Sequence, residues 1–120
     1  MTPLRILIVE DEWSIAYDHS CVLQAAGHIV VGPVPSVDRA LLLIANEAID
    51  VALLDYRLDG HTSIALAAPL RERGIPFALV TGHVAPDMPE PFRSSRLVSK
   101  PVEATTLVDT VEALAAQRPG

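Results

Sequence analysis

Several residue types are scarce in this sequence, and each scarcity removes a class of protein. The 120 residues include one cysteine, Cys21, so no disulfide can form within the chain and a reducing, cytoplasmic location is expected. No apolar run approaches the roughly 20 residues that cross a bilayer. The opening segment, residues 1–10, has too short an apolar stretch for a secretory signal. The sequence therefore favours neither a secreted nor a membrane-spanning protein.

Basic residues are also few. Lysine and arginine total 9 against 15 acidic residues, the net charge is −6, and no basic stripe occurs. Nucleic acid and anionic membrane surfaces are thus poor candidates for the main partner. Eight arginines accompany only one lysine, Lys100. This solitary lysine raises the question of what it does that arginine could not.

The sequence contains enough apolar material for one folded domain. Half of the residues are hydrophobic, which argues against disorder. Aromatic residues make up only 4% of the chain, so the core has to be largely aliphatic. A length of 120 residues fits one domain and leaves no room for two.

Five short apolar runs alternate with segments of helical periodicity. The runs cover residues 4–9, 29–34, 51–54, 77–80 and 97–98, and the helical segments cover residues 14–26, 37–48, 63–73 and 102–117. The runs are continuous rather than alternating, which is typical of parallel strands buried on both faces. The alternation of strand and helix predicts an α/β fold, a doubly wound five-stranded parallel sheet with helices on both faces and right-handed crossovers.

Local signals mark several boundaries. Ser36 is placed to cap a helix N-terminus, and Gly27 and Gly74 stand where helices should end. Pro69 should bend the third helix. Several prolines crowd residues 83–95, so we expect a loop or a single turn there and a shortened or absent fourth helix.

Polar side chains follow four of the five predicted strands. Glu10 and Asp11 come after the first strand, Asp55 after the third, Thr81 after the fourth and Lys100 after the fifth. In a doubly wound sheet, functional groups collect at the carboxyl ends of the strands. We therefore expect three acids, one hydroxyl and one ammonium to converge on one edge.

This set of residues predicts phosphoryl chemistry assisted by a metal. Carboxylates held close together repel one another, and a hard divalent cation relieves that repulsion. Mg²⁺ prefers oxygen ligands and keeps waters and phosphate oxygens in its shell. Asp55, at the centre, can attack phosphorus as a nucleophile. Lys100, a compact point charge, can neutralise the transferring group together with the metal, and Thr81 can donate its hydroxyl to a phosphoryl oxygen.

Each of these residues also has an ordinary structural explanation when taken alone. Asp11 could cap a helix, Asp55 could be a turn residue, and Thr81 with Gly82 is a common turn pair. What favours a site is their joint order, with the groups at different strand ends of one short chain.

With these motifs assembled, the chain resembles the CheY-like receiver domains of bacterial response regulators over essentially its whole length. The matching segments are residues 6–12 (Ile-Leu-Ile-Val-Glu-Asp-Glu), 53–55 (Leu-Leu-Asp), 58–60 (Leu-Asp-Gly), 81–82 (Thr-Gly) and 99–101 (Ser-Lys-Pro). The resemblance implies a single receiver domain over residues 1–120 with no output domain, and a flavodoxin-like sheet of strand order 2-1-3-4-5. It also implies a stand-alone response regulator of a two-component phosphorelay with a downstream protein target.

The resemblance assigns a metal site and a nucleophile. It implies that Asp55 accepts a phosphoryl group from a histidine kinase or histidine phosphotransfer protein. Asp11, Asp55 and the backbone carbonyl of Arg57 would ligate Mg²⁺ directly, and Glu10 would act mostly through water. Such a protein catalyses its own phosphorylation and dephosphorylation, and no separate substrate turnover is expected.

Two further expectations come from the resemblance. Thr81 and Lys100 would assist the transfer. The Lys100–Pro101 peptide would be cis, although only about 5–6% of X–Pro bonds in folded proteins are.

The chain also departs from the family pattern. Most receivers carry Tyr or Phe on the fifth strand as a rotamer switch, where this sequence has Leu97. Residues 79–84 match part of the Phe-Ala-Thr-Gly-hydrophobic-Tyr motif found in a subgroup of single-domain regulators from alphaproteobacteria. Membership of that subgroup is accordingly a prediction from a partial motif.

The same fold can also have functions that do not involve phosphorylation of an aspartate. A flavodoxin-like ligand- or protein-binding module without phosphorylation is the main alternative, but the acids at residues 10–12 would repel a flavin phosphate. A hydrolase of the aspartyl-phosphatase kind would need an Asp-x-Asp motif, and residues 55–57 read Asp-Tyr-Arg. A folded but silent receiver is disfavoured because every chemical position is filled.

The other aromatic, cysteine and histidine residues are expected to have structural rather than chemical roles. We expect Trp13 and Tyr56 to pack at the rim of the site, and Cys21 to face the core as an inert small hydrophobe. Surface positions are expected for His19, His28 and His61.

Overall fold

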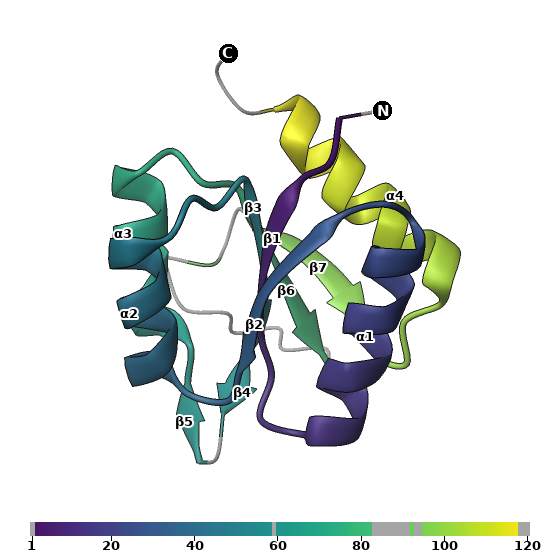
Figure 1. The fold of residues 1–120 in the computed structure, drawn as a ribbon. Coiled ribbons are helices and arrows are strands. Elements are labelled where there is room, and N and C mark those ends of the chain that lie inside the picture. Colours follow the sequence, from purple (N-terminus) through teal and green to yellow (C-terminus); the bar gives the residue numbers. More distant parts are fainter. Residues whose placement is uncertain (1, 59, 83–91, 93–94, 118–120) are drawn as a thin grey trace.

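The computed structural model describes residues 2–58, 60–82, 92 and 95–117. Its centre is a five-stranded sheet of order β2-β1-β3-β6-β7 in which every neighbouring pair is parallel (Figure 1). The strands are β1 Arg5–Val9, β2 Ile29–Val34, β3 Val51–Asp55, β6 Phe77–Thr81 and β7 Arg96–Ser99. Counted within this sheet, the order is the predicted 2-1-3-4-5, so the predicted fold is confirmed.

Helices cover both faces of the sheet, as predicted. On one face lie α1 and α4, and on the other lie α2 and α3 (Figure 1). Their bounds are α1 Trp13–Ala25, α2 Val37–Asn46, α3 Ala67–Glu72 and α4 Ala104–Ala116. Within the described ranges, no helix is both long and apolar enough to cross a membrane.

The central strands are buried on both faces, which explains their unbroken apolar sequences. Every residue of β3 and β6 is buried. Successive side chains of a strand point to opposite faces. Leu53 accordingly packs in the cluster that includes Leu107 of α4, whereas Leu54 packs in the cluster that includes Ile44 of α2. The sheet thus separates two aliphatic cores.

The predicted helix boundaries hold at three positions. Ser36 Oγ accepts a hydrogen bond from the backbone N–H of Arg39 at 3.3 Å, which caps α2. Gly27 and Gly74 follow the last residues of α1 and α3 closely and have φ angles of +92° and +67°. That left-handed conformation is strained for residues other than glycine, so glycine is the favoured residue at the ends of these helices.

The third helix is broken rather than merely bent. A 3₁₀ turn, η1 Ile64–Leu66, precedes α3, and Pro69 lies within the first turn of α3. Proline has no N–H to donate and its ring crowds the carbonyl four residues earlier, which here belongs to Ala65. The regular hydrogen-bond ladder therefore cannot run back from α3 through η1.

Two of the three histidines expected at the surface are buried. His19 and His28 are 5% and 4% exposed, so the prediction was wrong for both, whereas His61 is exposed as expected. The Leu4 N–H donates to His28 Nδ1 at 3.1 Å, and His28 Nε2 lies 3.3 Å from Glu112 Oε2. Hydrogen bonds at both ring nitrogens make this buried position tolerable for a polar side chain.

The expectation for Cys21 was also wrong, because this residue is exposed on α1. The buried residues of α1 are Ala16, His19, Ser20 and Leu23. Ser20 tolerates burial because its hydroxyl donates to the Ala16 carbonyl at 2.7 Å. Because two of these buried residues are polar, the hydrophobic pattern of the sequence did not identify the buried face of this helix.

The expectation of a loop or short turn over residues 83–95 falls almost wholly outside the described residues. Phe92, which is described, is 1% exposed. Its ring lies edge-on to Tyr56 and Phe77, with centroid distances of 6.0 and 5.9 Å. Phe92 therefore contributes a large side chain to the core on the α2 and α3 face.

Candidate functional site

The polar residues predicted to converge do lie at one edge of the sheet. Glu10 and Asp11 directly follow β1, and Asp55 and Thr81 are the last residues of β3 and β6. Lys100 directly follows β7. Because all the strands of this sheet run in the same direction, their carboxyl ends meet at one edge.

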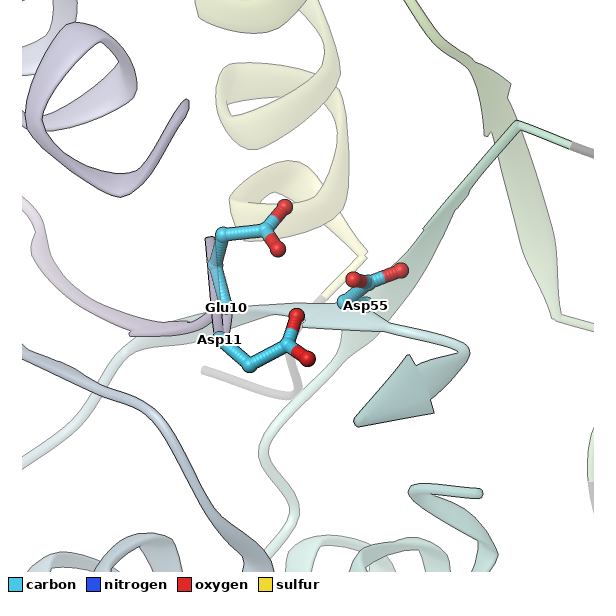
Figure 2. Close-up of side chains that lie close together, drawn as sticks. All are labelled: Glu10, Asp11 and Asp55. Atoms are coloured by element: carbon cyan, nitrogen blue, oxygen red, sulfur yellow. The ribbon is translucent and has the colours of Figure 1, made fainter. Parts of the chain in front are cut away.

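The three acids form a tight cluster. One carboxylate oxygen from each of Glu10, Asp11 and Asp55 lies within 4.8 Å of those of the other two. Figure 2 shows the three side chains extending toward a common space from two neighbouring strand ends. Glu10 and Asp55 are only 5% and 8% exposed, while Asp11 is exposed. Solvent and ligands can thus reach the cluster from the side of Asp11.

Lys100 supplies positive charge to this cluster. Its Nζ lies 2.7 Å from Glu10 Oε1 and 3.2 Å from Asp55 Oδ2. Its backbone N–H donates to the Thr81 carbonyl at 2.9 Å, which fixes the loop after β7 to the end of β6. The Lys100–Pro101 peptide is cis, as the resemblance implied.

Both carboxylate oxygens of Glu10 are engaged within the protein. Oε1 faces Lys100, and Oε2 accepts a hydrogen bond from the Glu12 N–H at 3.1 Å. Glu10 is therefore held in place by contacts from two directions.

The environment shifts the protonation of Asp55 and Lys100. Burial, followed by the hydrogen bond and negative charge of Glu10, raises the pKa of Asp55 to about 7, against a smaller opposing effect of Lys100. Burial alone lowers the pKa of Lys100, but the hydrogen bond to Glu10 and the charges of Asp55 and Glu10 outweigh it and raise the pKa. Lys100 therefore remains an ammonium, and Asp55 is poised between its two forms.

A short hairpin that the sequence did not reveal follows Asp55. Strand β4, Arg57–Leu58, pairs antiparallel with β5, His61–Thr62. Arg57 therefore lies on a paired backbone two residues beyond Asp55, and its guanidinium lies 5.7 Å from the centroid of the Tyr56 ring. The runs of two residues were too short to give a periodic signal.

Two neighbours of the acids differ from expectation. Trp13 was expected to pack at the rim, but it is 75% exposed and stacks on Tyr17 with ring centroids 5.2 Å apart. Tyr56 is buried at 9% exposure and belongs to the core on the α2 and α3 face. The alternation of β3 could have indicated this, because Tyr56 continues the series begun by Ala52 and Leu54.

Comparison with known families agrees with this arrangement. The family profile described as response regulator receiver domain matches residues 6–112, which include all of the site residues above. The chain belongs to the response regulator receiver family. Receiver domains act in two-component signalling, interact with histidine kinases or phosphotransfer proteins, and generally bind Mg²⁺ at an acidic pocket. This receiver domain has an acidic cluster, formed by Glu10, Asp11 and Asp55.

Solved structures show the same fold. The solution structure of SdrG from Sphingomonas melonis Fr1 is 33% identical with a TM-score of 0.82, and the match covers 97% of this chain and 99% of that one. A response regulator receiver protein from Sinorhizobium medicae WSM419 is 25% identical with a TM-score of 0.81, covering 98% of each chain. A CheY-like receiver domain protein from Methanospirillum hungatei JF-1 is 23% identical with a TM-score of 0.84, and the match covers 98% of this chain and 97% of that one. At this identity the likeness shows the fold alone. Comparison with curated proteins gave no match.

The raised pKa of Asp55 predicts a pH-dependent stability without metal. An unfolded aspartate has a pKa of about 3.9, whereas folding raises the pKa of Asp55 to about 7. Between these values the folded state keeps a proton that the unfolded state has lost, so stability falls as pH rises through this window. Asp55→Asn, which cannot ionise, should therefore gain more in melting temperature over the unsubstituted protein at about pH 8 than at about pH 5.

The control for this measurement is Asp109→Asn, at an exposed position on α4. Its melting temperature should track that of the unsubstituted protein at both pH values. An advantage of Asp55→Asn that is the same at both pH values would show that neither burial nor the neighbouring Glu10 disfavours the Asp55 carboxylate.

Proposed function

We propose that this receiver domain accepts a phosphoryl group on Asp55, in a reaction that requires Mg²⁺. The donor is a histidine kinase or a histidine phosphotransfer protein. The observation that carries the proposal is the contact of Lys100 Nζ with Asp55 Oδ2, at 3.2 Å, beside the two acids that follow β1. A nucleophile, a charge-neutralising ammonium and a set of metal ligands thereby share one edge.

The donor set suits Mg²⁺. The clustered groups are all carboxylates, and hard divalent cations prefer oxygen ligands. Three carboxylates face one nearby ammonium, which leaves a formal excess of two negative charges when all are ionised (3 − 1 = 2). We propose that Asp11, Asp55 and the backbone carbonyl of Arg57 hold the ion, with Glu10 acting through water. When bound, the ion supplies charge neutralisation and favours the ionised form of Asp55.

The transfer follows from the positions of the side chains. A carboxylate oxygen of Asp55 forms the new O–P bond, the P–N bond of the donor phosphohistidine breaks, and its electron pair returns to the imidazole. The Lys100 ammonium, now between two carboxylates, can move to a phosphoryl oxygen as charge builds there. We propose that the Thr81 hydroxyl, at the end of the neighbouring β6, donates to a second phosphoryl oxygen.

The alternative, a flavodoxin-like module that is not phosphorylated, fits the site less well. Such a module would present neutral or positive groups to a ligand phosphate at the end of β1. Here that position carries Glu10 and Asp11, and Glu10 is buried. A buried carboxylate is costly unless opposite charge and hydrogen bonds offset it, so a ligand phosphate without a cation would be repelled here.

Phosphorylation of Asp55 is tested by intact mass. Incubation of the protein with acetyl phosphate and Mg²⁺ should add one phosphoryl group, and Asp55→Asn should add none because an amide is not a nucleophile for this reaction. The exposed α4 variant Asp109→Asn should react as the unsubstituted protein does. If Asp55→Asn gains the group at an undiminished rate, Asp55 is not the acceptor.

Metal binding is tested by thermal stability. Mg²⁺ should raise the melting temperature, because it binds the folded cluster in preference to the unfolded chain. Asp11→Ala should weaken this response, and it should raise the stability without metal because it removes a neighbouring negative charge. Asp109→Ala should leave the response unchanged. A full Mg²⁺ response in Asp11→Ala would remove Asp11 from the ligand set.

A further inference from the structure

Three aromatic rings connect the site to the core in a chain with few aromatics. Phe92 is edge-on to both Tyr56 and Phe77, with centroid distances of 6.0 and 5.9 Å and interplanar angles of 75° and 72°. Phe77 and Phe92 are the only phenylalanines in the sequence. Edge-to-face pairs are favoured by the ring quadrupoles beyond the area that they bury, so this arrangement is directional.

Tyr56 is the ring of this group that adjoins the nucleophile. Its backbone N–H donates to the Val80 carbonyl at 3.2 Å, and its carbonyl accepts from the Ser63 N–H at 2.9 Å. The backbone after Asp55 is thus fixed to β6 on one side and to the turn before η1 on the other. The Tyr56 ring is the remaining element that has to be held in place.

The direction of the Asp55 side chain depends on this ring. Adjacent side chains at the end of β3 point to opposite faces. Tyr56 packs in the core beneath α2 and α3, while the Asp55 carboxylate contacts Lys100 and neighbours Glu10. A rotation of the backbone that redirected Asp55 would have to pull the Tyr56 ring away from Phe92. Packing at Phe92 therefore opposes misorientation of the carboxylate.

We propose that Phe92 is a positioning residue for this site: by holding the Tyr56 ring, it orients Asp55 and the backbone of Arg57 for metal binding and phosphoryl transfer. This inference rests on the proposed function and deepens it. Phe92 acts on the site through its ring contact with Tyr56.

The contact between Tyr56 and Phe92 would also couple the state of the site to the packing of Phe92. Coupling free energies are reciprocal, so if Phe92 packing favours the metal-bound and phosphorylated site, then that site must favour Phe92 packing. Leu97, at the position where most receivers carry an aromatic switch, is 49% exposed and pairs in register with Leu79 of β6. The aromatic contact to the phosphorylation site is instead made by Phe92 through Tyr56.

Phe77 provides a matched control. It contacts the same Phe92 ring with nearly the same geometry, and its own side chain is 7% exposed. However, Phe77 is the first residue of β6, at the end opposite to Thr81 and the site. A substitution there removes a comparable ring contact of Phe92 but leaves the Tyr56–Phe92 contact itself in place.

The experiment compares Phe92→Leu with Phe77→Leu. Calorimetric titration with Mg²⁺ alone measures affinity, and amide shifts of Asp55 and Tyr56 report local geometry. Both variants should lose stability, but only Phe92→Leu should weaken Mg²⁺ binding, by about 2- to 10-fold, as expected if one aromatic pair is coupled to the site. Only Phe92→Leu should also move the amide shifts of Asp55 and Tyr56 in the absence of metal.

A double-mutant cycle ties the effect to the ring pair. Tyr56→Leu should weaken Mg²⁺ binding as Phe92→Leu does, and the double variant should be no weaker than the single ones, because both remove one interaction. If Phe92→Leu fails to fold, Phe92→Met keeps an apolar side chain of similar size without the ring and should show the same loss of affinity.

The outcomes separate this inference from the proposed function. If the unsubstituted protein binds no Mg²⁺ and accepts no phosphoryl group, the proposed function fails. If the unsubstituted protein does both, and Phe92→Leu and Phe77→Leu have equal Mg²⁺ affinities, Phe92 contributes only to the core and the inference is overturned. Additive effects of Tyr56→Leu and Phe92→Leu would likewise overturn it.

Discussion

The Lys100 ammonium between two buried carboxylates is the interaction on which the site depends. Its distances of 2.7 Å to Glu10 and 3.2 Å to Asp55 bring opposite charges together where little water can screen them. A carboxylate buried without a partner is strongly destabilising, so these acids need the lysine. The one ammonium does not fully offset them, and the pKa of Asp55 is raised first by burial and then by the neighbouring Glu10. We propose that metal binding and phosphoryl transfer use this imbalance.

The parallel sheet makes this interaction possible. It brings Glu10 and Lys100, 90 positions apart in sequence, to neighbouring points on one edge. The Glu10 N–H donates to the Val34 carbonyl and the Lys100 N–H to the Thr81 carbonyl, each near 3 Å, so the loops that carry the charges are anchored to adjacent strands. The position also suits a lysine. A compact ammonium on a flexible stem contacts both carboxylates here, whereas the planar guanidinium of arginine demands a fixed geometry.

The sequence predicted those features whose signals are local or periodic. Continuous apolar strands, glycines after helices and the acids at strand ends all lie where they were expected. Side-chain hydrogen bonds that allow polar residues to be buried account for two of the errors. Hydrogen bonds to Leu4 and Glu112 allow His28 to be buried, and a bond to the Ala16 carbonyl allows Ser20 to take a core position on the helix that leaves Cys21 exposed. Neither partnership can be read from composition or spacing. The burial of Tyr56 was accessible from strand alternation, but its contact with Phe92 was not, because it joins segments 36 positions apart.

The most direct test of the central claim is to locate the acyl phosphate chemically. The protein is treated with acetyl phosphate and Mg²⁺, reduced with borohydride, digested and sequenced by tandem mass spectrometry. Reduction converts an aspartyl phosphate to homoserine, which marks the acceptor permanently. Homoserine is expected at position 55 and at no other acid. It should be absent when Mg²⁺ is chelated beforehand. A mark at Glu10 or Asp11, or phosphate recovered as a stable ester on a hydroxyl side chain, would contradict this expectation.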